Sequence, residues 1–141
     1  MRASQRAIIE AVYAAWAAHD VAAVSACLHP DVVYKLHLPT GAWPIAGTLR
    51  GKHNVIGSLT RFLRGFDVIE YKPLKISCDD ALAVSVAKIQ YLHKPTGHLV
   101  DAISRNLVHV RGDKILYFEV IHDAERLRAF FEMVSRMSVE A

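Results

Sequence analysis

Residues 99–123 constrain the fold of this chain most strongly, because two long apolar segments flank a short turn there. Leu99–Val110 and Ile115–His122 are rich in Val, Ile, Leu, Tyr and Phe, and Arg111–Asp113 separates them around a glycine. This arrangement predicts a β-hairpin. Polar residues inside it are informative, because an unpaired polar group in a core is costly. The polar interruptions are Ser104, Asn106, Glu119 and His122.

Two helices are predicted before the first strand. Ser4 is an N-cap candidate for the first helix, whose apolar residues recur at i, i+3, i+4, i+7 and i+8, as on one buried face. This predicted stripe consists of Ile8, Ala11, Val12, Ala15 and Trp16. Asp20 is positioned to cap a short second helix that Pro30 ends.

The middle of the chain predicts one strand, one loop and one helix. Val32–Leu38 alternates, with Tyr34 and Leu36 on one face, as in a half-buried strand. Residues 39–51 contain several Pro and Gly and are predicted to form a loop. A third helix is predicted over Lys52–Phe66.

The remaining pattern predicts further strands and a last helix. Asp67–Ser77, with Pro73, is an edge or bulged strand, and Leu82–Leu92 is a long one. Lys94–Gly97 is a turn before the hairpin, and Asp123 is a candidate N-cap for the C-terminal helix. Early helices followed by an antiparallel meander predict an α+β fold, in which a curved antiparallel sheet wraps around the N-terminal helices. Residues 1–141 are predicted to form a single domain.

Composition narrows the function classes. The net charge is +3, and no run of five or more basic residues occurs, so neither nucleic-acid binding nor membrane binding is expected. Two cysteines, Cys27 and Cys78, without metal-ligand spacing, are typical of reduced cytoplasmic thiols. A hydrophobic content of 52% leaves two explanations open, an alanine-rich sequence or an apolar cavity together with a subunit interface.

The order and spacing of several segments resemble the NTF2-like superfamily, in particular SnoaL-like proteins and relatives of ketosteroid isomerase. The resemblance covers nearly the whole chain. It rests on a helix ending near Trp16, the sequence Leu28-His29-Pro30-Asp31-Val32-Val33, the Pro44–Gly51 loop before a helix, and Gly112-Asp113-Lys114-Ile115. The resemblance implies a conical fold, with a pocket between the concave sheet and the helices, and a homodimer that forms through the sheet.

The resemblance also implies which residues line the pocket. They are Trp16, Tyr34, Leu36, Asn106, Phe118, Val120 and His122. If Lys94–Gly97 is a tight turn, antiparallel pairing sets Asn106 opposite Ser85 and Ser104 opposite Ala87, on the same face. The same register would place Tyr91 near the pocket rim.

The register of the last hairpin has two alternatives. A two-residue loop pairs Asn106 with Glu119, whereas a three-residue loop pairs Asn106 with Phe118. A shift of one residue moves every side chain to the other face. The resemblance favours Phe118 inward, and Glu119 inward remains the alternative.

The residues that the resemblance makes catalytic are partly replaced. Isomerases of this type use an aspartate on the first strand, where Leu36 stands, and the related cyclases and epoxide hydrolases use one on the last strand, where Val120 stands. His122 remains as a general acid or base, with backbone hydrogen bonding as the alternative. Tyr34 is a substrate hydrogen-bond donor or an amphipathic core residue. Asn106 polarises a carbonyl or pairs with Ser85.

Two hypotheses follow. In the first, an apolar pocket binds a small hydrophobic carbonyl or ring compound and supports a cofactor-free isomerisation, cyclisation or hydration by proton transfer, with His122, Tyr34 and Asn106 as the catalytic residues. No metal is expected, since no recognised ligand spacing occurs. In the second hypothesis, the chain is a non-catalytic module for dimerisation or protein binding.

Overall fold

The computed structural model describes residues 2–37, 47–79 and 82–122, together with residues 129, 133 and 136. The side chains of residues 2–4 and of His122 are outside this description. The predicted loop up to residue 46 and the cap at Asp123 also lie outside the described residues.

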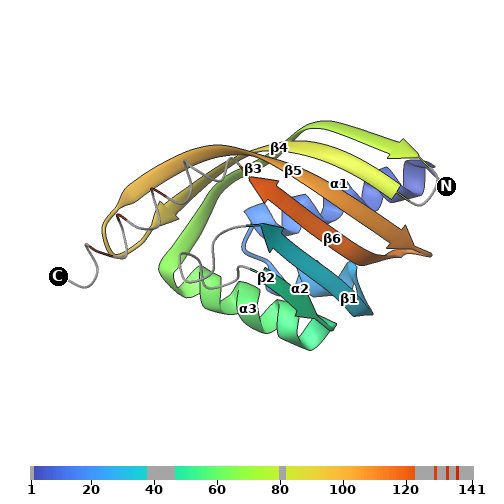
Figure 1. Ribbon diagram of the computed structural model, residues 1–141, viewed down its shortest axis with the longest axis horizontal. Coiled ribbons are helices and arrows are strands. Elements are labelled where there is room, and N and C mark those ends of the chain that lie inside the picture. Colours follow the sequence, from blue (N-terminus) through green and yellow to red (C-terminus); the bar gives the residue numbers. More distant parts are fainter. Residues whose placement is uncertain are drawn as a thin grey trace.

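Three helices and six strands form the described part of the chain (Figure 1). The helices are α1 (Arg2–Ala17), α2 (Val21–Ala26) and α3 (Lys52–Gly65). The strands are β1 (Leu28–His37), β2 (Gly47–Arg50), β3 (Phe66–Asp79), β4 (Leu82–His93), β5 (His98–Arg111) and β6 (Lys114–His122).

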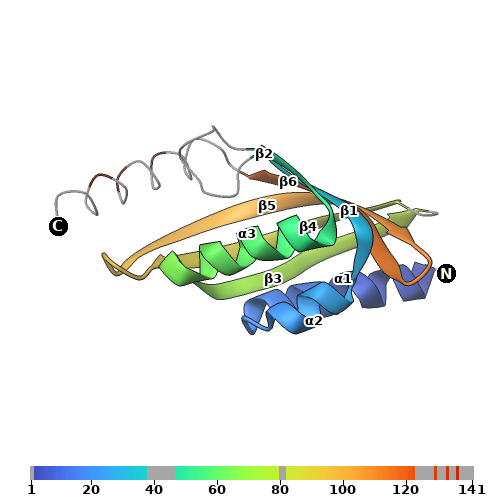
Figure 2. The ribbon, with the colours of Figure 1, turned by 90° about the horizontal axis from the view of Figure 1, so that it is seen from below.

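The strands form one curved sheet in the order β2-β1-β6-β5-β4-β3, and the sheet does not close. All neighbours are antiparallel except β1 and β6, which run parallel, so the sheet is mixed. The helices lie on one side of it (Figure 2). Their apolar residues pack against the inward-facing residues of the strands in a single core. The predicted α+β fold class is therefore confirmed, although the sheet contains a parallel pair that the strand alternation did not predict.

Several predicted boundaries differ from the structure. α2 ends at Ala26 and β1 already begins at Leu28, so Pro30 lies within a strand rather than at the end of a helix. The short strand β2 occupies part of the segment that was predicted to be loop. This strand has four residues, which are too few to show a strand periodicity in the sequence. Its first residue, Gly47, and the residue that follows the strand, Gly51, have positive φ values of 101° and 87°.

The buried face of α1 agrees with the predicted stripe in part, since Val12 and Ala15 are buried and Ile8 and Trp16 pack partly buried against the core. Ile9 is fully buried, whereas Ala11 is exposed. The buried residues of this helix are Gln5, Ile9, Val12, Tyr13 and Ala15. The buried face thus extends beyond the predicted stripe to Tyr13, whose phenol group reaches Asn106 and Ser85 on the sheet.

The pairing of β4 with β5 agrees with the prediction. Ser85 lies opposite Asn106, and Ala87 lies opposite Ser104. Gly97, at φ 74°, allows the preceding turn to close with a hydrogen bond of 2.8 Å from its N–H to the carbonyl of His93. A tight turn therefore sets the register of this pair, as expected.

Neither predicted pairing of Asn106 across β5 and β6 is observed. The hairpin does have a two-residue turn, with Arg111 opposite Lys114, but Leu116 has no partner and forms an irregularity of the β-bulge kind. The bulge shifts the register by one residue, so Asn106 lies opposite Val120. Phe118 nevertheless faces inward, with 8% of its surface exposed, as the favoured alternative predicted.

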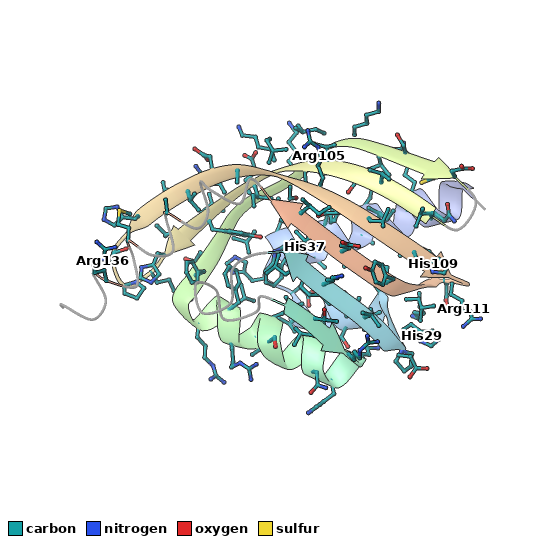
Figure 3. All side chains as sticks on the ribbon, viewed as in Figure 1. His29, His37, Arg105, His109, Arg111 and Arg136 are labelled. Atoms are coloured by element: carbon teal, nitrogen blue, oxygen red, sulfur yellow. The ribbon has the colours of Figure 1, made fainter. Side chains whose placement is uncertain are left out.

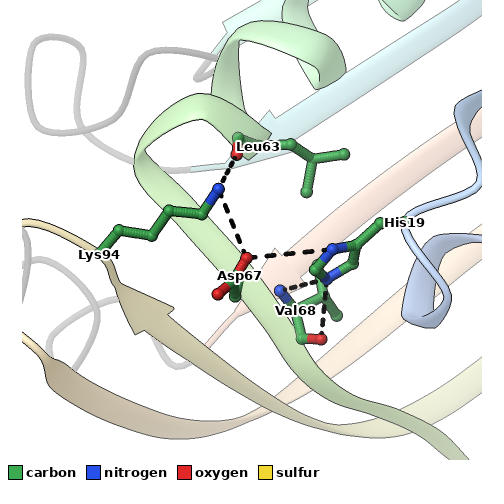
Figure 4. A network of polar contacts seen from close by, with 5 residues as sticks. All are labelled: His19, Leu63, Asp67, Val68 and Lys94. Carbon is green, nitrogen blue, oxygen red and sulfur yellow. Dashed lines mark hydrogen bonds and ion pairs between the residues drawn. The ribbon is translucent and has the colours of Figure 1, made fainter.

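Hydrogen bonds and an ion pair connect the C-terminal ends of α1 and α3 to the sheet and to the β4–β5 turn (Figure 4). Nε2 of His19 accepts a hydrogen bond of 3.0 Å from the N–H of Val68 on the edge strand β3. Lys94, in the β4–β5 turn, lies 3.5 Å from the Asp67 carboxylate and donates a hydrogen bond of 2.8 Å to the carbonyl of Leu63 near the end of α3. A cation at that end also complements the helix dipole.

Candidate functional site

An apolar cavity lies between the sheet and the helices. The space open to the centre of a water molecule is about 60 Å³, several times the roughly 10–15 Å³ that one water requires. Residues from all three helices and from four strands surround it. The lining residues are Val12, Tyr13, Trp16, Val24, Leu28, Val32, Tyr34, Leu36, Val55, Leu59, Tyr71, Tyr91, Phe118 and Val120.

Aromatic rings make up much of the cavity wall. Tyr34 on β1 and Phe118 on β6 are partners in the parallel register, and their rings stack with centroids 5.9 Å apart and planes 13° apart. The indole N–H of Trp16 donates a hydrogen bond to the hydroxyl of Tyr91. Stacked rings of this kind offer flat apolar surfaces to a ring compound.

None of the described lining residues is charged or has a carboxyl or imidazole group. Burying an ion without a partner is strongly unfavourable. The wall therefore favours a neutral molecule, and its polar groups are the hydroxyls of the tyrosines.

Tyr34 differs from Tyr13 and Tyr71 in the hydrogen bonding of its hydroxyl group. Within the part of the chain that the structure describes, this hydroxyl forms no hydrogen bond. Burial raises the pKa of Tyr34 far above its usual range, and proximity to Tyr71 and Tyr13 raises this pKa further. Tyr34 therefore keeps its proton at neutral pH and can donate it in a hydrogen bond to a ligand.

Asn106 is the centre of a buried polar network next to the cavity. Its side-chain nitrogen donates hydrogen bonds of 2.7 Å to the Tyr13 hydroxyl and 3.0 Å to the Tyr71 hydroxyl. The Tyr13 hydroxyl is also hydrogen-bonded to Ser85, and the Tyr71 hydroxyl lies 3.4 Å from Oγ of Ser104. The network thus joins α1 to three adjacent strands.

The orientation of the Asn106 amide follows from this network. Both amide hydrogens are used, and Oδ1 is buried without a hydrogen-bond partner among the described residues. The reversed amide would leave two N–H groups unpaired instead of one oxygen, and each unpaired buried group costs about 1–3 kcal/mol. The hydroxyls of Tyr13 and Tyr71 are therefore acceptors for Asn106.

Burial raises the pKa of both tyrosines in this network. For Tyr13 burial is the largest cause and the neighbouring Tyr71 adds to it, whereas the bonds to Ser85 and Asn106 act in the opposite direction. For Tyr71 the bonds to Ser104 and Asn106 likewise oppose the effect of burial. Both phenols stay protonated at neutral pH.

The structure divides the predicted site residues into three groups. Those that line the cavity are Trp16, Tyr34, Leu36, Tyr91, Phe118 and Val120. Ser85, Ser104 and Asn106 are buried in the adjoining network and are not among the lining residues. The side chain of His122 lies outside the description, although the backbone of His122 pairs with Ser104. Tyr91, expected near the rim, is buried, with 5% of its surface exposed.

Sequence reasoning missed Tyr13 and Tyr71. Tyr13 continues the helical spacing of Ile9 and Trp16, so a stripe placed one residue further along would have included it. Tyr71 follows an irregularity of the β-bulge kind in β3, between Val68 and Glu70. A bulge interrupts the alternation of inward and outward side chains, so the alternation does not predict that Tyr71 faces inward.

Two further classes of site are not seen in the described residues. No group of three or more His, Cys, Asp or Glu side chains among them could hold a metal ion. None of the described helices combines the length and the apolar character needed to cross a bilayer.

Comparisons with solved structures identify the fold. An NTF2-like protein from Burkholderia xenovorans LB400 has a TM-score of 0.77 and 18% identity, over 92% of this chain and 96% of that one. A putative isomerase from Rhodopseudomonas palustris has a TM-score of 0.78 and 12% identity, over 90% and 96%. TerC, co-crystallised with polyporic acid, has a TM-score of 0.77 and 18% identity, over 92% and 98%. At these identities the likeness concerns the fold.

Comparison with curated proteins gives no match. The model of the SnoaL-like domain, in contrast, matches residues 9–118, which include all of the described lining residues of the cavity except Val120. The match covers well over half of the sequence. This chain therefore belongs to the SnoaL-like family, within the NTF2-like fold.

Proposed function

We propose that this protein binds a small, neutral, largely apolar molecule that presents a hydrogen-bond acceptor, such as a carbonyl oxygen, to Tyr34. The observation that carries the proposal is the uncommitted Tyr34 hydroxyl in an otherwise apolar aromatic cavity. A ligand oxygen that accepts a hydrogen bond from Tyr34 gains specificity as well as affinity, because the rest of the wall is largely apolar.

The same arrangement would polarise a bound carbonyl, as a cofactor-free isomerase, cyclase or hydratase requires. Such a reaction also needs a base. Leu36 and Val120 occupy the positions where the family resemblance implies aspartates, and both are apolar cavity residues. His122 is our candidate for the base, and Asn106 contributes indirectly, because both of its amide hydrogens are committed to tyrosines. In this proposal, binding and polarisation belong to Tyr34, and turnover depends on His122.

Binding is tested with two probes of similar shape, 4-methylacetophenone and 4-isopropyltoluene, which differ in whether they carry a carbonyl oxygen. We expect calorimetry to give a two- to tenfold preference for the ketone, corresponding to one hydrogen bond of about 0.5–1.5 kcal/mol. Tyr34→Phe should remove this preference. Tyr117→Phe is the matched control, because the Tyr117 hydroxyl bonds Glu119, whose side chain pairs with His37 rather than lining the cavity.

Failure of both probes to bind the folded protein would contradict the proposal. So would a ketone preference that survives in Tyr34→Phe. For turnover, His122→Gln should abolish any proton exchange at the carbon next to the carbonyl of a bound ketone, while Kd changes little. Exchange that continues at the wild-type rate would remove His122 from the mechanism.

A second role, homodimerisation through the sheet, is favoured by the outer face of the sheet. Leu82, Val84, Ile103 and Ile121 are 42–48% exposed there, on three adjacent strands. Large apolar side chains exposed on one sheet face are the kind of surface that an interaction between copies would cover. Sedimentation should show a dimer that Val84→Asp and Ile121→Asp dissociate, whereas Ile69→Asp, on the edge strand, should not. A wild-type monomer would contradict this role.

A further inference from the structure

We infer that the cavity selects ligands carrying a hydrogen-bond donor, such as a hydroxyl group, in addition to the acceptor that meets Tyr34. This inference rests on the proposed function and specifies the class of ligand further. It follows from the way in which the Asn106 network uses the hydroxyl hydrogens of Tyr13 and Tyr71, two tyrosines of the same cavity wall.

The first step is a count of donors and acceptors. A tyrosine hydroxyl has one hydrogen to donate and two lone pairs that can accept. At Tyr13 and Tyr71, one lone pair accepts a hydrogen bond from Asn106. Each hydroxyl then has one hydrogen and one lone pair left.

The second step concerns that hydrogen. The Tyr13 hydroxyl is hydrogen-bonded to Ser85, and the Tyr71 hydroxyl to Ser104. Either hydroxyl of each pair can donate on geometry alone. We assign the tyrosine as the donor and the serine as the acceptor, because a phenol is more acidic than an aliphatic alcohol. Tyr13 and Tyr71 consequently have no hydrogen for a ligand, and each retains one lone pair.

The third step is the contrast with Tyr34. Its hydroxyl has no bond within the described residues, so it alone among these three tyrosines can donate to a ligand. The three tyrosines line one cavity: the rings of Tyr34 and Tyr13 both contact Phe118, and the rings of Tyr13 and Tyr71 lie with centroids 5.0 Å apart. One small molecule can therefore meet a donor at Tyr34 and an acceptor at Tyr71 or Tyr13. A second carbonyl on the ligand would find no donor there, and burying it would be unfavourable.

The first test compares 4-hydroxyacetophenone with 4-methylacetophenone, because a hydroxyl and a methyl group have similar size. Without an acceptor in the wall, desolvation would make the hydroxyl compound the weaker ligand. We expect the hydroxyl compound to bind two- to tenfold more tightly. The advantage should persist in Tyr34→Phe and decrease in Tyr71→Phe. Thermal unfolding confirms that each variant is folded.

The second test reverses the role of Tyr71. Ser104→Ala removes the acceptor of the Tyr71 hydrogen and frees it for a ligand. The quantity to measure is the ratio of the affinity for 4-methoxyacetophenone to the affinity for 4-ethylacetophenone. This ratio should be two to ten times higher in Ser104→Ala than in the wild type. Ser58→Ala is the matched control, since Ser58 is also buried but contacts Arg61 on α3 instead of a cavity tyrosine.

The outcomes separate this inference from the proposed function. If no acetophenone binds, the proposed function itself fails. If the acetophenones bind with a Tyr34-dependent preference for the ketone, but the methyl compound binds more tightly than the hydroxyl compound, only this inference is overturned. An unchanged methoxy-to-ethyl ratio in folded Ser104→Ala would also overturn it.

Discussion

The side-chain nitrogen of Asn106 lies 2.7 Å from the hydroxyl oxygen of Tyr13, so one hydrogen bond joins β5 to α1 inside the core. Asn106 is 1% exposed and Tyr13 is 2% exposed. The two residues are separated by 93 positions in the sequence. In a buried site of this kind, a hydrogen bond fixes how the helix lies on the sheet, because unpaired alternatives are costly.

Removing the Asn106 amide should therefore destabilise the protein. We expect Asn106→Ala to lower the free energy of unfolding by about 2–4 kcal/mol, since it leaves a cavity and deprives two buried hydroxyls of a partner. Urea denaturation measures the change. Asn54→Ala is the control, because Asn54 is exposed and its amide bonds the carbonyl of Arg50. Equal effects of the two substitutions would contradict a structural role for the network.

His19 allows backbone strain to be separated from hydrogen bonding. Its φ is 60°, in the left-handed region, and its ring accepts the hydrogen bond from the Val68 N–H. His19→Ala and His19→Gly both lose that bond, but glycine adopts the conformation without strain. We expect His19→Gly to be more stable than His19→Ala by about 1 kcal/mol in denaturation experiments. Greater stability of the alanine variant would show that the backbone is not strained there.

Glu119 gives a prediction about acid stability. Its carboxylate accepts a hydrogen bond of 2.6 Å from the Tyr117 hydroxyl and pairs with His37 at the end of β1, which is labelled in Figure 3. The Tyr117 bond is the largest of the causes that lower the Glu119 pKa, and the bond to His37 is the next.

A lowered carboxyl pKa in the folded state stabilises the protein above the ordinary pKa of about 4.3, and this contribution is lost as the pH falls through the folded value. Tyr117→Phe should raise the Glu119 pKa towards the ordinary value, measured by NMR titration of the carboxyl carbon. The same variant should lose less stability on acidification than the wild type. Tyr13→Phe, distant from this carboxylate in the cavity wall, should leave the titration unchanged.

Filling the cavity should separate binding from folding. Leu36→Phe adds volume to a residue of the cavity wall that is 2% exposed. We expect ligand binding to fall at least tenfold, while overpacking changes stability by no more than about 1–3 kcal/mol. Leu99→Phe, at a position 56% exposed, should alter neither property. Undiminished binding in folded Leu36→Phe would place the ligand elsewhere.

The parts of the fold that depend on local pattern could be predicted from the sequence. The turn at Lys94–Gly97 fixed the pairing of Ser85 with Asn106, because a short turn leaves one register. The parallel pairing of β1 with β6 could not be predicted, since it joins segments that no turn connects. Alternation alone does not say which strand lies beside another.

The candidate site was predictable only in part. Tyr34 and Leu36 follow from simple alternation in β1, and both line the cavity. Tyr13 was missed because the predicted stripe of α1 included the exposed Ala11 in place of the buried Tyr13. Whether Tyr34 or Asn106 has an uncommitted donor depends on contacts between distant elements, which the sequence does not contain.

The bulge at Leu116 decides the chemistry of a space that Leu116 does not itself line. With the same turn and no bulge, Glu119 would take the place of Val120 opposite Asn106 and bring a carboxylate to the inner face. One unpaired backbone residue thus keeps the Glu119 carboxylate out of the described cavity wall, which contains no charged side chain. The chemical character of the wall at this point therefore depends on backbone register as much as on which amino acids the strand contains.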